Sequence, residues 1–412
     1  MRVWKSSLNL WLNLKRTISK GEQVTMYNIK TLNKISKIGL SQFDETKYTY
    51  SDDIENPDAV LVRSASMHDM EFPTSLKAIA RAGAGTNNIP CDKCAEQGIV
   101  VFNTPGANAN AVKELVLAGL LISSRKVIPG IEWAKTLKGE GDQVGKLVEK
   151  GKSAFAGPEI MGKTLGVIGL GAIGVLVANA AEKLGMTVYG YDPYLSVEGA
   201  WKLSRNVKHA TSLDEIYANC DYITIHVPLN DATKNTVNAE SIAKMKDGVR
   251  ILNYARGGLV DSDAIIKALE DGKVASYVVD FPDDKVLGVE GVIAIPHLGA
   301  STPESEENCA YMAANEIIAY LENGSIINSV NMPNVSLGAV NGARICIIHK
   351  NVPNMIAQIS TCVSNAGLNI DQLVNNSRGD YAYTVVDLAN VTDDAIAQIE
   401  KIDAVISVRV IK

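Results

Sequence analysis

Residues 163–193 have the sequence KTLGVIGLGAIGVLVANAAEKLGMTVYGYDP, and this stretch decides the fold. It begins with an apolar run, 164–168, of the length of one buried parallel strand. Gly169, Gly171 and Gly174 follow as G-x-G-x-x-G. In such a turn the first glycine permits the tight bend, the second lets a pyrophosphate approach, and the third lets helix and strand pack closely. The turn therefore predicts a dinucleotide-binding βαβ unit.

The rest of the stretch indicates which dinucleotide is bound. Residues 172–184 are expected to form a helix whose first N–H groups face the phosphates. The next strand, 187–191, ends at Asp192. A carboxylate there accepts hydrogen bonds from the ribose hydroxyls and repels a 2′-phosphate, and no arginine follows within the next few residues. The predicted cofactor is NAD rather than NADP.

Composition excludes several classes of partner. The chain has 412 residues, of which 46% are hydrophobic and 21% charged. A net charge of −6 argues against nucleic-acid binding, and no apolar run reaches the length of a membrane span. The six cysteines are scattered, and the C-x-x-C of Cys91 and Cys94 is interpreted as packing. We expect a cytoplasmic protein with no metal site.

The N-terminal part contains an extension and a first α/β domain. Residues 1–25 are basic, with no acid before Glu22, as in transit peptides and in disordered extensions; we interpret them as an extension. Four apolar runs separated by polar turns then predict an α/β domain: 37–40, 59–62, 78–81 and 100–102. Arg63 and Arg81 lie at the ends of two runs, where anions bind; surface arginines without a ligand are the alternative.

Strands and helices alternate through the middle of the chain. Residues 110–128 predict a long helix, and 138–162 predict a loop. Beyond Asp192 further strands are expected at 221–226, 250–254, 276–280 and 292–295, with helices between most of them. This order predicts a parallel sheet with helices on both faces.

A smaller unit ends the chain. Residues 302–322 predict a helix and 325–340 a linker. Strands are then expected at 343–349, 369–376, 381–388 and 405–411, with helices at 353–365 and 393–401. The order βαββαβ predicts a ferredoxin-like unit.

Polar residues follow three strands of the predicted parallel sheet. They are Arg256 in NYARGG, Asp283 and Asp284 in VVDFPDD, and His297 in AIPHLGAST. Ligands bind beyond the carboxyl ends of such strands. The guanidinium would hold a carboxylate, the imidazole would move a hydroxyl proton while hydride passes to the nicotinamide, and the acid would orient the imidazole. His226 in ITIHVPL is the alternative acid–base group, although packing near the cofactor fits it better.

From about residue 30 to residue 412 the chain resembles the D-isomer-specific 2-hydroxyacid dehydrogenases. The motifs that carry the resemblance are VRSAS at 62, RAGAGTNN at 81, GLGAIG at 169, HVPL at 226, ARGG at 255 and PHLGAST at 296. The resemblance implies a Rossmann-type doubly wound parallel sheet inserted in a flavodoxin-like α/β substrate domain, followed by the ferredoxin-like unit. The expected parts are an extension at 1–25, a substrate-binding domain at 26–110 and 301–328, an NAD-binding domain at 111–300, a linker at 329–342 and a regulatory domain at 343–412.

The resemblance also implies site residues. The catalytic set is Arg256, an acid and His297; one deletion relative to the family places Asp284 at the acid position, with Asp283 as its rival. The implied cofactor-binding residues are Gly169, Gly171, Ala172, Ile173, Gly174, Asp192, His226, Val227, Pro228, Thr233, Ala255, Arg256, Asp280, His297 and Gly299. The implied substrate-binding residues are Arg63, Ser64, Arg81, Gly83, Ala84, Gly85, Asn108, Lys152, Arg256 and His297.

The C-terminal unit resembles an ACT domain, a regulatory amino-acid-binding module. His349, Asn351 and Asn369 match a serine-binding pattern, which implies L-serine as an effector; a dimerisation module without a ligand is the alternative. Within the family, the branch acting on 3-phosphoglycerate fits best. It implies oxidation of 3-phospho-D-glycerate to 3-phosphohydroxypyruvate, the first step of L-serine biosynthesis, by a homodimer or homotetramer under serine feedback inhibition. Alternatives are a dehydrogenase of unphosphorylated glycerate, lactate or glyoxylate, and a non-catalytic NAD-sensing protein.

Overall fold

The computed structural model describes residues 26–412, and the predicted extension at 1–25 lies outside them. The chain forms two compact units. Of the described residues, the first unit comprises 26–80, Asn87–Phe102 and Ala314–Lys412, and the second comprises Arg81–Thr86 and Asn103–Ala313. No helix within 26–412 is long and apolar enough to cross a membrane.

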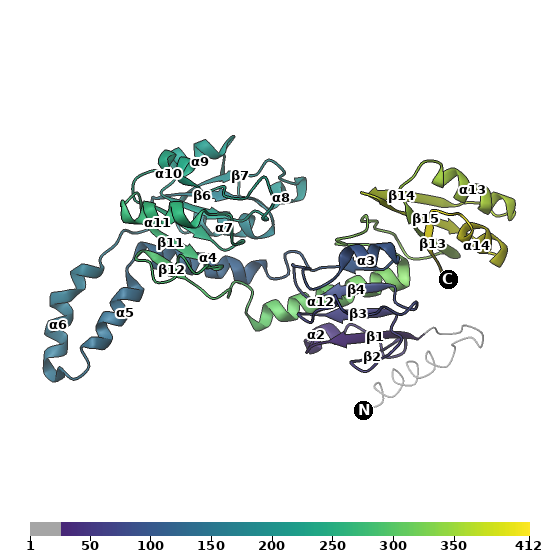
Figure 1. The fold of residues 1–412 in the computed structure, drawn as a ribbon, viewed down its shortest axis with the longest axis horizontal. Coiled ribbons are helices and arrows are strands. Elements are labelled where there is room, and N and C mark those ends of the chain that lie inside the picture. Colours follow the sequence, from purple (N-terminus) through teal and green to yellow (C-terminus); the bar gives the residue numbers. More distant parts are fainter. Residues whose placement is uncertain (1–25) are drawn as a thin grey trace, which may run out of the picture. The chain divides into compact units, whose positions relative to one another are not determined.

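The first unit contains a five-stranded sheet in the order β2-β1-β3-β4-β5 (Figure 1). Its elements are β1 (Tyr27–Leu32), α2 (Lys37–Leu40), β2 (Tyr48–Ser51), β3 (Ala59–Val62), β4 (Ala78–Arg81), α3 (Cys91–Glu96) and β5 (Val100–Phe102). The pairs β1·β2, β1·β3 and β4·β5 are parallel. This is the flavodoxin-like order, and it confirms the predicted fold of the domain.

One apolar run of this domain is a helix and not a strand. Residues 37–40 form α2, because the Ser36 side chain accepts the Ile38 N–H and starts a helical turn. The strand beside β2 and β3 is β1, with the sequence YNIKTL. Only Ile29 of β1 is fully buried. Because polar and apolar residues alternate along β1, the sequence contains no apolar run there that would predict a strand.

The second unit contains a seven-stranded sheet in the order β12-β11-β10-β9-β6-β7-β8, with every adjacent pair parallel. Its strands are β6 (Thr164–Ile168), β7 (Thr187–Tyr191), β8 (Lys208–His209), β9 (Tyr222–Ile225), β10 (Val249–Asn253), β11 (Val274–Val279) and β12 (Val292–Ala294). The main helices are α4 (Ala109–Ser124), α7 (Ala172–Lys183), α8 (Val197–Lys202), α9 (Leu213–Asn219), α10 (Ala239–Lys244) and α11 (Ser262–Glu270). The predicted Rossmann sheet is confirmed.

Helices cover both faces of this sheet. Leu165 and Val167 of β6 pack in one core cluster with α4 and α7. Ile168 at the end of the same strand packs in another cluster with α9, α10 and α11. Alternate residues of one strand point to opposite faces, so both faces must be apolar, as the continuous run at 164–168 indicates.

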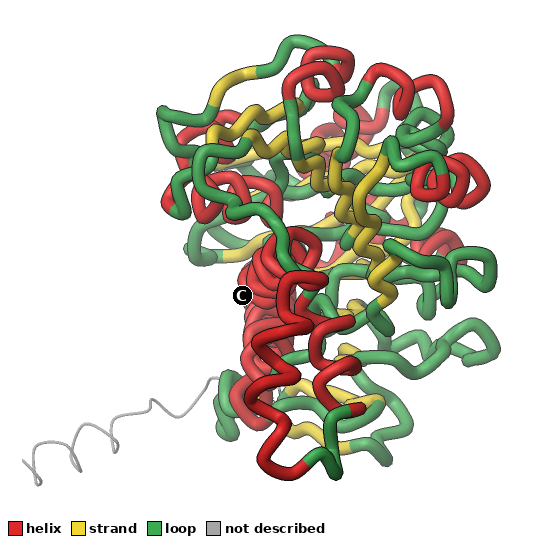
Figure 2. Tube along the Cα trace, turned by 90° about the vertical axis from the view of Figure 1, so that its left-hand side faces the viewer, coloured by secondary structure: helices red, strands yellow, loops and turns green. Residues whose placement is uncertain are grey.

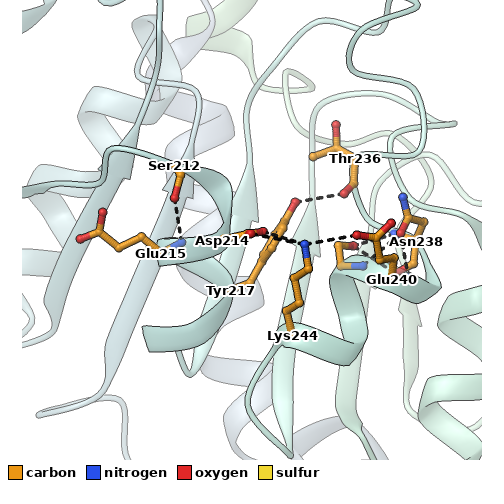
Figure 3. Close-up of polar contacts among 9 residues, drawn as sticks. Ser212, Asp214, Glu215, Tyr217, Thr236, Asn238, Glu240 and Lys244 are labelled. Atoms are coloured by element: carbon orange, nitrogen blue, oxygen red, sulfur yellow. Dashed lines mark hydrogen bonds and ion pairs between the residues drawn. The ribbon is translucent and has the colours of Figure 1, made fainter.

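Polar contacts fix α9 and α10, the helices before and after β9 in the chain (Figure 3). The Asn238 side chain accepts N–H groups of the first turn of α10, and Ser241 bonds back to Asn238 N–H, which makes a capping box. The Tyr217 hydroxyl of α9 donates to Thr236 O at 3.0 Å, and burial raises the pKa of Tyr217 to about 12. Lys244 links the exposed Asp214 and Glu240, contacts that add little to stability.

The predicted loop at 138–162 is partly helical. The helix predicted at 110–128 ends at Ser124, and α5 (Val127–Thr136), η1 (Gly141–Gln143), α6 (Val144–Gly151) and η2 (Lys152–Phe155) follow. Figure 2 shows this segment as adjacent helices. Trp133 packs on Phe155 with ring centroids 5.2 Å apart, a contact between residues distant in sequence that composition does not reveal.

The chain ends in a four-stranded antiparallel sheet in the order β14-β15-β13-β16. After α12 (Pro303–Asn323) its elements are β13 (Ala343–Lys350), α13 (Met355–Asn365), β14 (Gln372–Arg378), β15 (Tyr381–Leu388), α14 (Asp393–Glu400) and β16 (Val405–Ile411). Side chains of α13 and α14 share a core cluster with β13 and β15. This confirms the predicted βαββαβ unit.

Side chains of this sheet hold the carboxyl end of α12. Arg409 donates to Tyr320 O at 2.7 Å and Leu321 O at 3.0 Å. Arg344 donates to Asn323 O at 2.7 Å and also forms a two-pronged ion pair with Asp387 at 2.6 and 2.7 Å. The last carbonyls of a helix lack partners within it and carry partial negative charge. The two guanidinium groups therefore complete this helix end.

We predict that Arg344→Met lowers the free energy of unfolding by about 3–5 kcal/mol, because it leaves the Asp387 carboxylate without its cation in a site where Arg344 is only 2% exposed. Urea unfolding of the full chain measures this. Lys202→Met breaks the exposed pair with Glu198 and serves as the control, with a cost below about 1 kcal/mol. Equal midpoints for the two variants would show that the Arg344 pair does not stabilise the protein.

Candidate active site

The glycine-rich turn joins β6 to α7 in the second unit. A Cβ at Gly174 would lie 1.9 Å from Gly169 O, so close packing requires glycine there. A Cβ at Gly171, the N-cap of α7, would meet nothing within 4 Å. Packing within the chain does not explain Gly171, whereas a pyrophosphate beside the helix N-terminus does. Ala172 and Ile173 form the first turn of that helix.

Asp192 lies beside this turn, directly after β7. Its Oδ2 accepts the Leu170 N–H at 2.8 Å, and its Oδ1 accepts the Tyr194 N–H at 2.8 Å. These bonds fix the carboxylate next to the second glycine of the turn, where the ribose of a dinucleotide lies. The residues present thus fit NAD, which would supply a hydride acceptor.

His226 follows β9, and its surroundings differ from those of an acid–base group. Its Nε2 lies 3.0 Å from Thr224 Oγ1, and its Nδ1 is buried without a hydrogen-bond partner in residues 26–412. Burial lowers the pKa of His226 to about 4, so the ring is neutral at neutral pH. Val227 and Pro228 lead into a loop that Thr233 fixes by donating to Pro228 O at 2.6 Å. This fits packing beneath the cofactor.

Arg256 and His297 both contact Phe281. The Arg256 guanidinium lies 5.6 Å from the Phe281 ring centroid, and the His297 ring centroid lies 4.3 Å from it. Both side chains are exposed, and each follows a strand of the same parallel sheet. The structure therefore brings the predicted guanidinium and imidazole to one aromatic ring, which the sequence did not single out.

Two buried polar side chains hold the turns that carry these residues. Asn253 donates to Arg256 O at 2.8 Å and accepts the Ala255 N–H at 3.2 Å. Asp280 accepts the N–H groups of Leu298 and Gly299 at 2.8 and 3.0 Å. Asp280 was predicted from the resemblance to bind the cofactor, whereas Asn253 was missed; its place at the end of an apolar strand, before ARGG, is the signal that was available.

The two candidate acids have other surroundings. Asp283 accepts the Ser262 hydroxyl at 2.6 Å and the Val286 N–H at 3.2 Å. Asp284 is exposed and has no hydrogen bond or ion pair with any other described residue. The role of either acid beside His297 stays a prediction.

The second unit also contains the RAGAG turn. A Cβ at Gly83 would lie 2.3 Å from Arg81 Nη1, so the guanidinium covers this glycine. Asn103 donates to Ala84 O at 2.5 Å, and Thr104 N–H donates to Gly83 O at 3.1 Å. These bonds place the turn, which continues to Gly85, in the unit that carries Arg256 and His297.

Four further predicted substrate residues lie outside this turn. Asn108 is the N-cap of α4 in the second unit, and its side chain makes no capping bond. Lys152 in the second unit forms an exposed ion pair with Glu149. Arg63 and Ser64 lie in the first unit, where the Ser64 N–H donates to Asn33 Oδ1 at 2.9 Å.

Comparison with known proteins identifies the family. Residues 119–299 match the family model described as D-isomer specific 2-hydroxyacid dehydrogenase, NAD binding domain. The D-3-phosphoglycerate dehydrogenase of Haemophilus influenzae is 35% identical over 360 residues, covering 83% of each chain. The chain belongs to the D-isomer-specific 2-hydroxyacid dehydrogenase family. The predicted cofactor, NAD, is confirmed with it.

Other members of the 2-hydroxyacid dehydrogenase family show the extent of the likeness. The D-3-phosphoglycerate dehydrogenase of Bacillus subtilis is 35% identical over 326 residues; the match covers 75% of this chain and 59% of that protein. The chain thus spans less than two thirds of that relative. The solved structure of 3-phosphoglycerate dehydrogenase from Entamoeba histolytica with NAD+ covers 76% of this chain and all of its own, with 26% identity and a TM-score of 0.55.

The C-terminal unit of this 2-hydroxyacid dehydrogenase contains the three predicted effector residues. His349 is buried, with Nδ1 2.7 Å from Lys350 O and Nε2 2.8 Å from Thr384 Oγ1. Both of its ring nitrogens therefore have partners within the chain. Asn351 donates to Gly379 O at 3.1 Å, and Asn369 donates to Asp371 Oδ1 at 3.3 Å. Both asparagines are exposed, which leaves their carbonyl oxygens open to a ligand.

Proposed function

We propose that the chain oxidises 3-phospho-D-glycerate to 3-phosphohydroxypyruvate with NAD. The observation that carries the substrate class is the Arg81 guanidinium, which covers Gly83 in the same unit as Arg256 and His297. Arg256 suits the carboxylate of a 2-hydroxy acid, and a second guanidinium suits a phosphate. Relatives named D-3-phosphoglycerate dehydrogenase support the same choice.

In this proposal the residues divide the work. Arg256 binds the substrate carboxylate and orients C2, while His297 accepts the proton of the C2 hydroxyl. NAD, when bound, accepts the hydride from C2. The C–H electron pair thus leaves with the hydride, the O–H electron pair forms the carbonyl, and the products are the 2-oxo acid, NADH and a proton.

A kinetic comparison tests this function. NADH oxidation is measured with 3-phosphohydroxypyruvate, pyruvate, glyoxylate and hydroxypyruvate, and we expect the highest kcat/KM with the phosphorylated substrate. Arg81→Gln should reduce that preference. His297→Asn should lower kcat by about 10²–10⁴-fold, because a positioned proton acceptor is lost, while NADH still binds.

Other outcomes decide between the alternatives. A higher kcat/KM for pyruvate or glyoxylate would favour a dehydrogenase of unphosphorylated acids. NADH binding without turnover of any of these acids would favour an NAD-sensing protein. The Asp192 carboxylate should also make NADPH the poorer cofactor in the same assay.

We infer that the protein is a homo-oligomer in which a second copy covers α5 and α6. Neither helix has a buried residue, and Ile131 is 50% exposed. The Trp133–Phe155 contact packs α5 on η2 but leaves Ile131 and Val144 exposed, and exposed apolar patches mark interaction surfaces. Light scattering after size exclusion should show that Ile131→Glu lowers the molar mass. Leu184→Glu, at an exposed apolar position outside these helices, is the control. Unchanged mass in Ile131→Glu would contradict this interface.

We also propose that L-serine binds the C-terminal unit and inhibits the enzyme. The exposed side chains of Asn351 and Asn369 support this, because amides both donate to a carboxylate and accept from an ammonium group. Asn351→Ala should raise the serine concentration needed for inhibition, measured by activity and calorimetry, whereas the exposed Asn365→Ala should not. Point variants are preferable to truncation, because Arg344 and Arg409 hold the end of α12. If millimolar serine produces no binding heat and no inhibition, serine is excluded as the effector.

A further inference from the structure

The turn after β4 directs two successive carbonyl groups to the end of β5. The Thr104 N–H donates to Gly83 O at 3.1 Å. The Asn103 side chain donates to Ala84 O at 2.5 Å. Both donors follow β5 directly, since that strand ends at Phe102. Gly83 has a φ of 153°, which a residue with a Cβ rarely adopts, and this lets the backbone bend toward the strand end.

The same two bonds fix the direction of two N–H groups. In a trans peptide unit the C=O and the N–H point in opposite directions, and no described peptide bond is cis. The Gly83 carbonyl shares its peptide unit with the Ala84 N–H, and the Ala84 carbonyl shares its unit with the Gly85 N–H. Both N–H groups therefore point away from the end of β5. Neither has a hydrogen-bond partner within residues 26–412, and both residues are half-buried.

Two neighbouring N–H donors suit the carboxylate of a substrate. Successive backbone N–H groups that share a direction form an anion-binding concavity. The Arg81 guanidinium covers Gly83 in the same turn and adds positive charge. Every 2-hydroxy acid carries a carboxylate, whereas only some carry a phosphate. The N–H groups therefore fit the part common to these substrates, and Arg81 fits the phosphate.

The segment that holds this turn also contacts the dinucleotide turn of the same unit. A Cβ at Gly106 would lie 3.1 Å from the Cβ of Ala172, closer than side chains normally pack. Ala172 begins α7, directly after Gly171. Residues 103–106 thus connect the turn at 83–85 to the helix N-terminus at which the pyrophosphate is expected.

We propose that Asn103 is a positioning residue for the 2-hydroxy acid: its amide holds the Ala84 carbonyl and thereby presents the Ala84 and Gly85 N–H groups to the substrate carboxylate. This rests on the proposed function, which places the turn at 83–85 in the substrate site. Of the two bonds that hold the turn, only the one from Asn103 is made by a side chain. Substitution can therefore remove it without changing the backbone.

The first test removes the amide and keeps the bulk of the side chain. Asn103→Leu has no donor, and Asn103→Gln retains an amide on a longer side chain. We expect Asn103→Leu to lower kcat/KM for 3-phosphohydroxypyruvate by about tenfold to a hundredfold, mainly through KM, because misplaced donors bind the substrate less well. Asn103→Gln should recover part of this loss. NADH affinity, followed by fluorescence, should be unchanged in both variants.

The second test separates the carboxylate from the phosphate. Pyruvate, glyoxylate and hydroxypyruvate carry no phosphate and are measured as substrates or as competitive inhibitors of 3-phosphohydroxypyruvate. Asn103→Leu should weaken their binding by about the same factor as that of 3-phosphohydroxypyruvate. Arg81→Gln should weaken only the phosphorylated acid. A loss confined to 3-phosphohydroxypyruvate in Asn103→Leu would overturn the assignment to the carboxylate.

Asn179→Leu is the matched control. Asn179 is half-buried in the same unit, and its amide donates to Lys202 O at 2.8 Å, outside the predicted substrate site. Loss of a hydrogen bond of this kind should lower the melting temperature of both leucine variants. Only Asn103→Leu should raise KM, which a merely structural role would not predict.

The outcomes keep this inference apart from the proposed function. Wild-type KM in Asn103→Leu would overturn the inference and leave the proposed function intact. An equal loss of NADH affinity and substrate affinity would also overturn it, because that pattern indicates a general loss of structure. Absence of turnover of every 2-oxo acid by the wild type would overturn the proposed function, and this inference with it.

Discussion

The parallel alignment of seven strands is the constraint on which the candidate site depends. Because every adjacent pair in this sheet is parallel, all the carboxyl ends lie at one edge. Asp192, Arg256 and His297 come from three different strand ends and yet share that edge. The order of the strands, with β6 beside both β7 and β9, places the glycine-rich turn where the chain changes direction across the sheet. Backbone hydrogen bonding between the strands therefore fixes the positions of site residues that are far apart in sequence.

The sequence predicted the parts of the fold in which local signals agree. The strands at 164–168 and 187–191 have the predicted bounds because an apolar run, glycines and an acid all indicate the same boundaries. Strand β1 was missed because its residues are mostly polar and half-buried. The helices within 138–162 were missed because the Trp133–Phe155 contact is tertiary. The pattern of apolar and polar residues along the chain predicts buried strands, but it does not predict side-chain contacts that form only on folding.

The candidate site likewise contains residues that the sequence predicted and residues that it did not. Arg256 and His297 were found because a strand end in a parallel sheet is a position that the sequence indicates. Asn253 and Asp280 act on backbone N–H and C=O groups, and which backbone groups they reach depends on the register of loops. Phe281 was not singled out because it follows β11 as an isolated aromatic residue, and its contact with two exposed polar residues follows from folding alone. The two residues missed, Asn253 and Phe281, are thus residues whose contacts with the candidate site form only on folding.

Two histidines that end strands of one sheet show how burial separates their roles. The Nδ1 atom of His226 is buried without a hydrogen-bond partner in the described chain, and burial lowers the pKa of His226 to about 4, which keeps the ring neutral. A pKa of about 4 makes His226 a weak base, and an efficient acid–base group has a pKa near the working pH, so His226 suits packing better than proton transfer. His297 is exposed and held in a left-handed turn, where the imidazole remains accessible to a substrate hydroxyl. The desolvation that lowers the pKa of His226 would also make His297 a weaker proton acceptor. The fold avoids this because it buries the Asp280 carboxylate, which holds the turn after His297, and leaves the imidazole exposed.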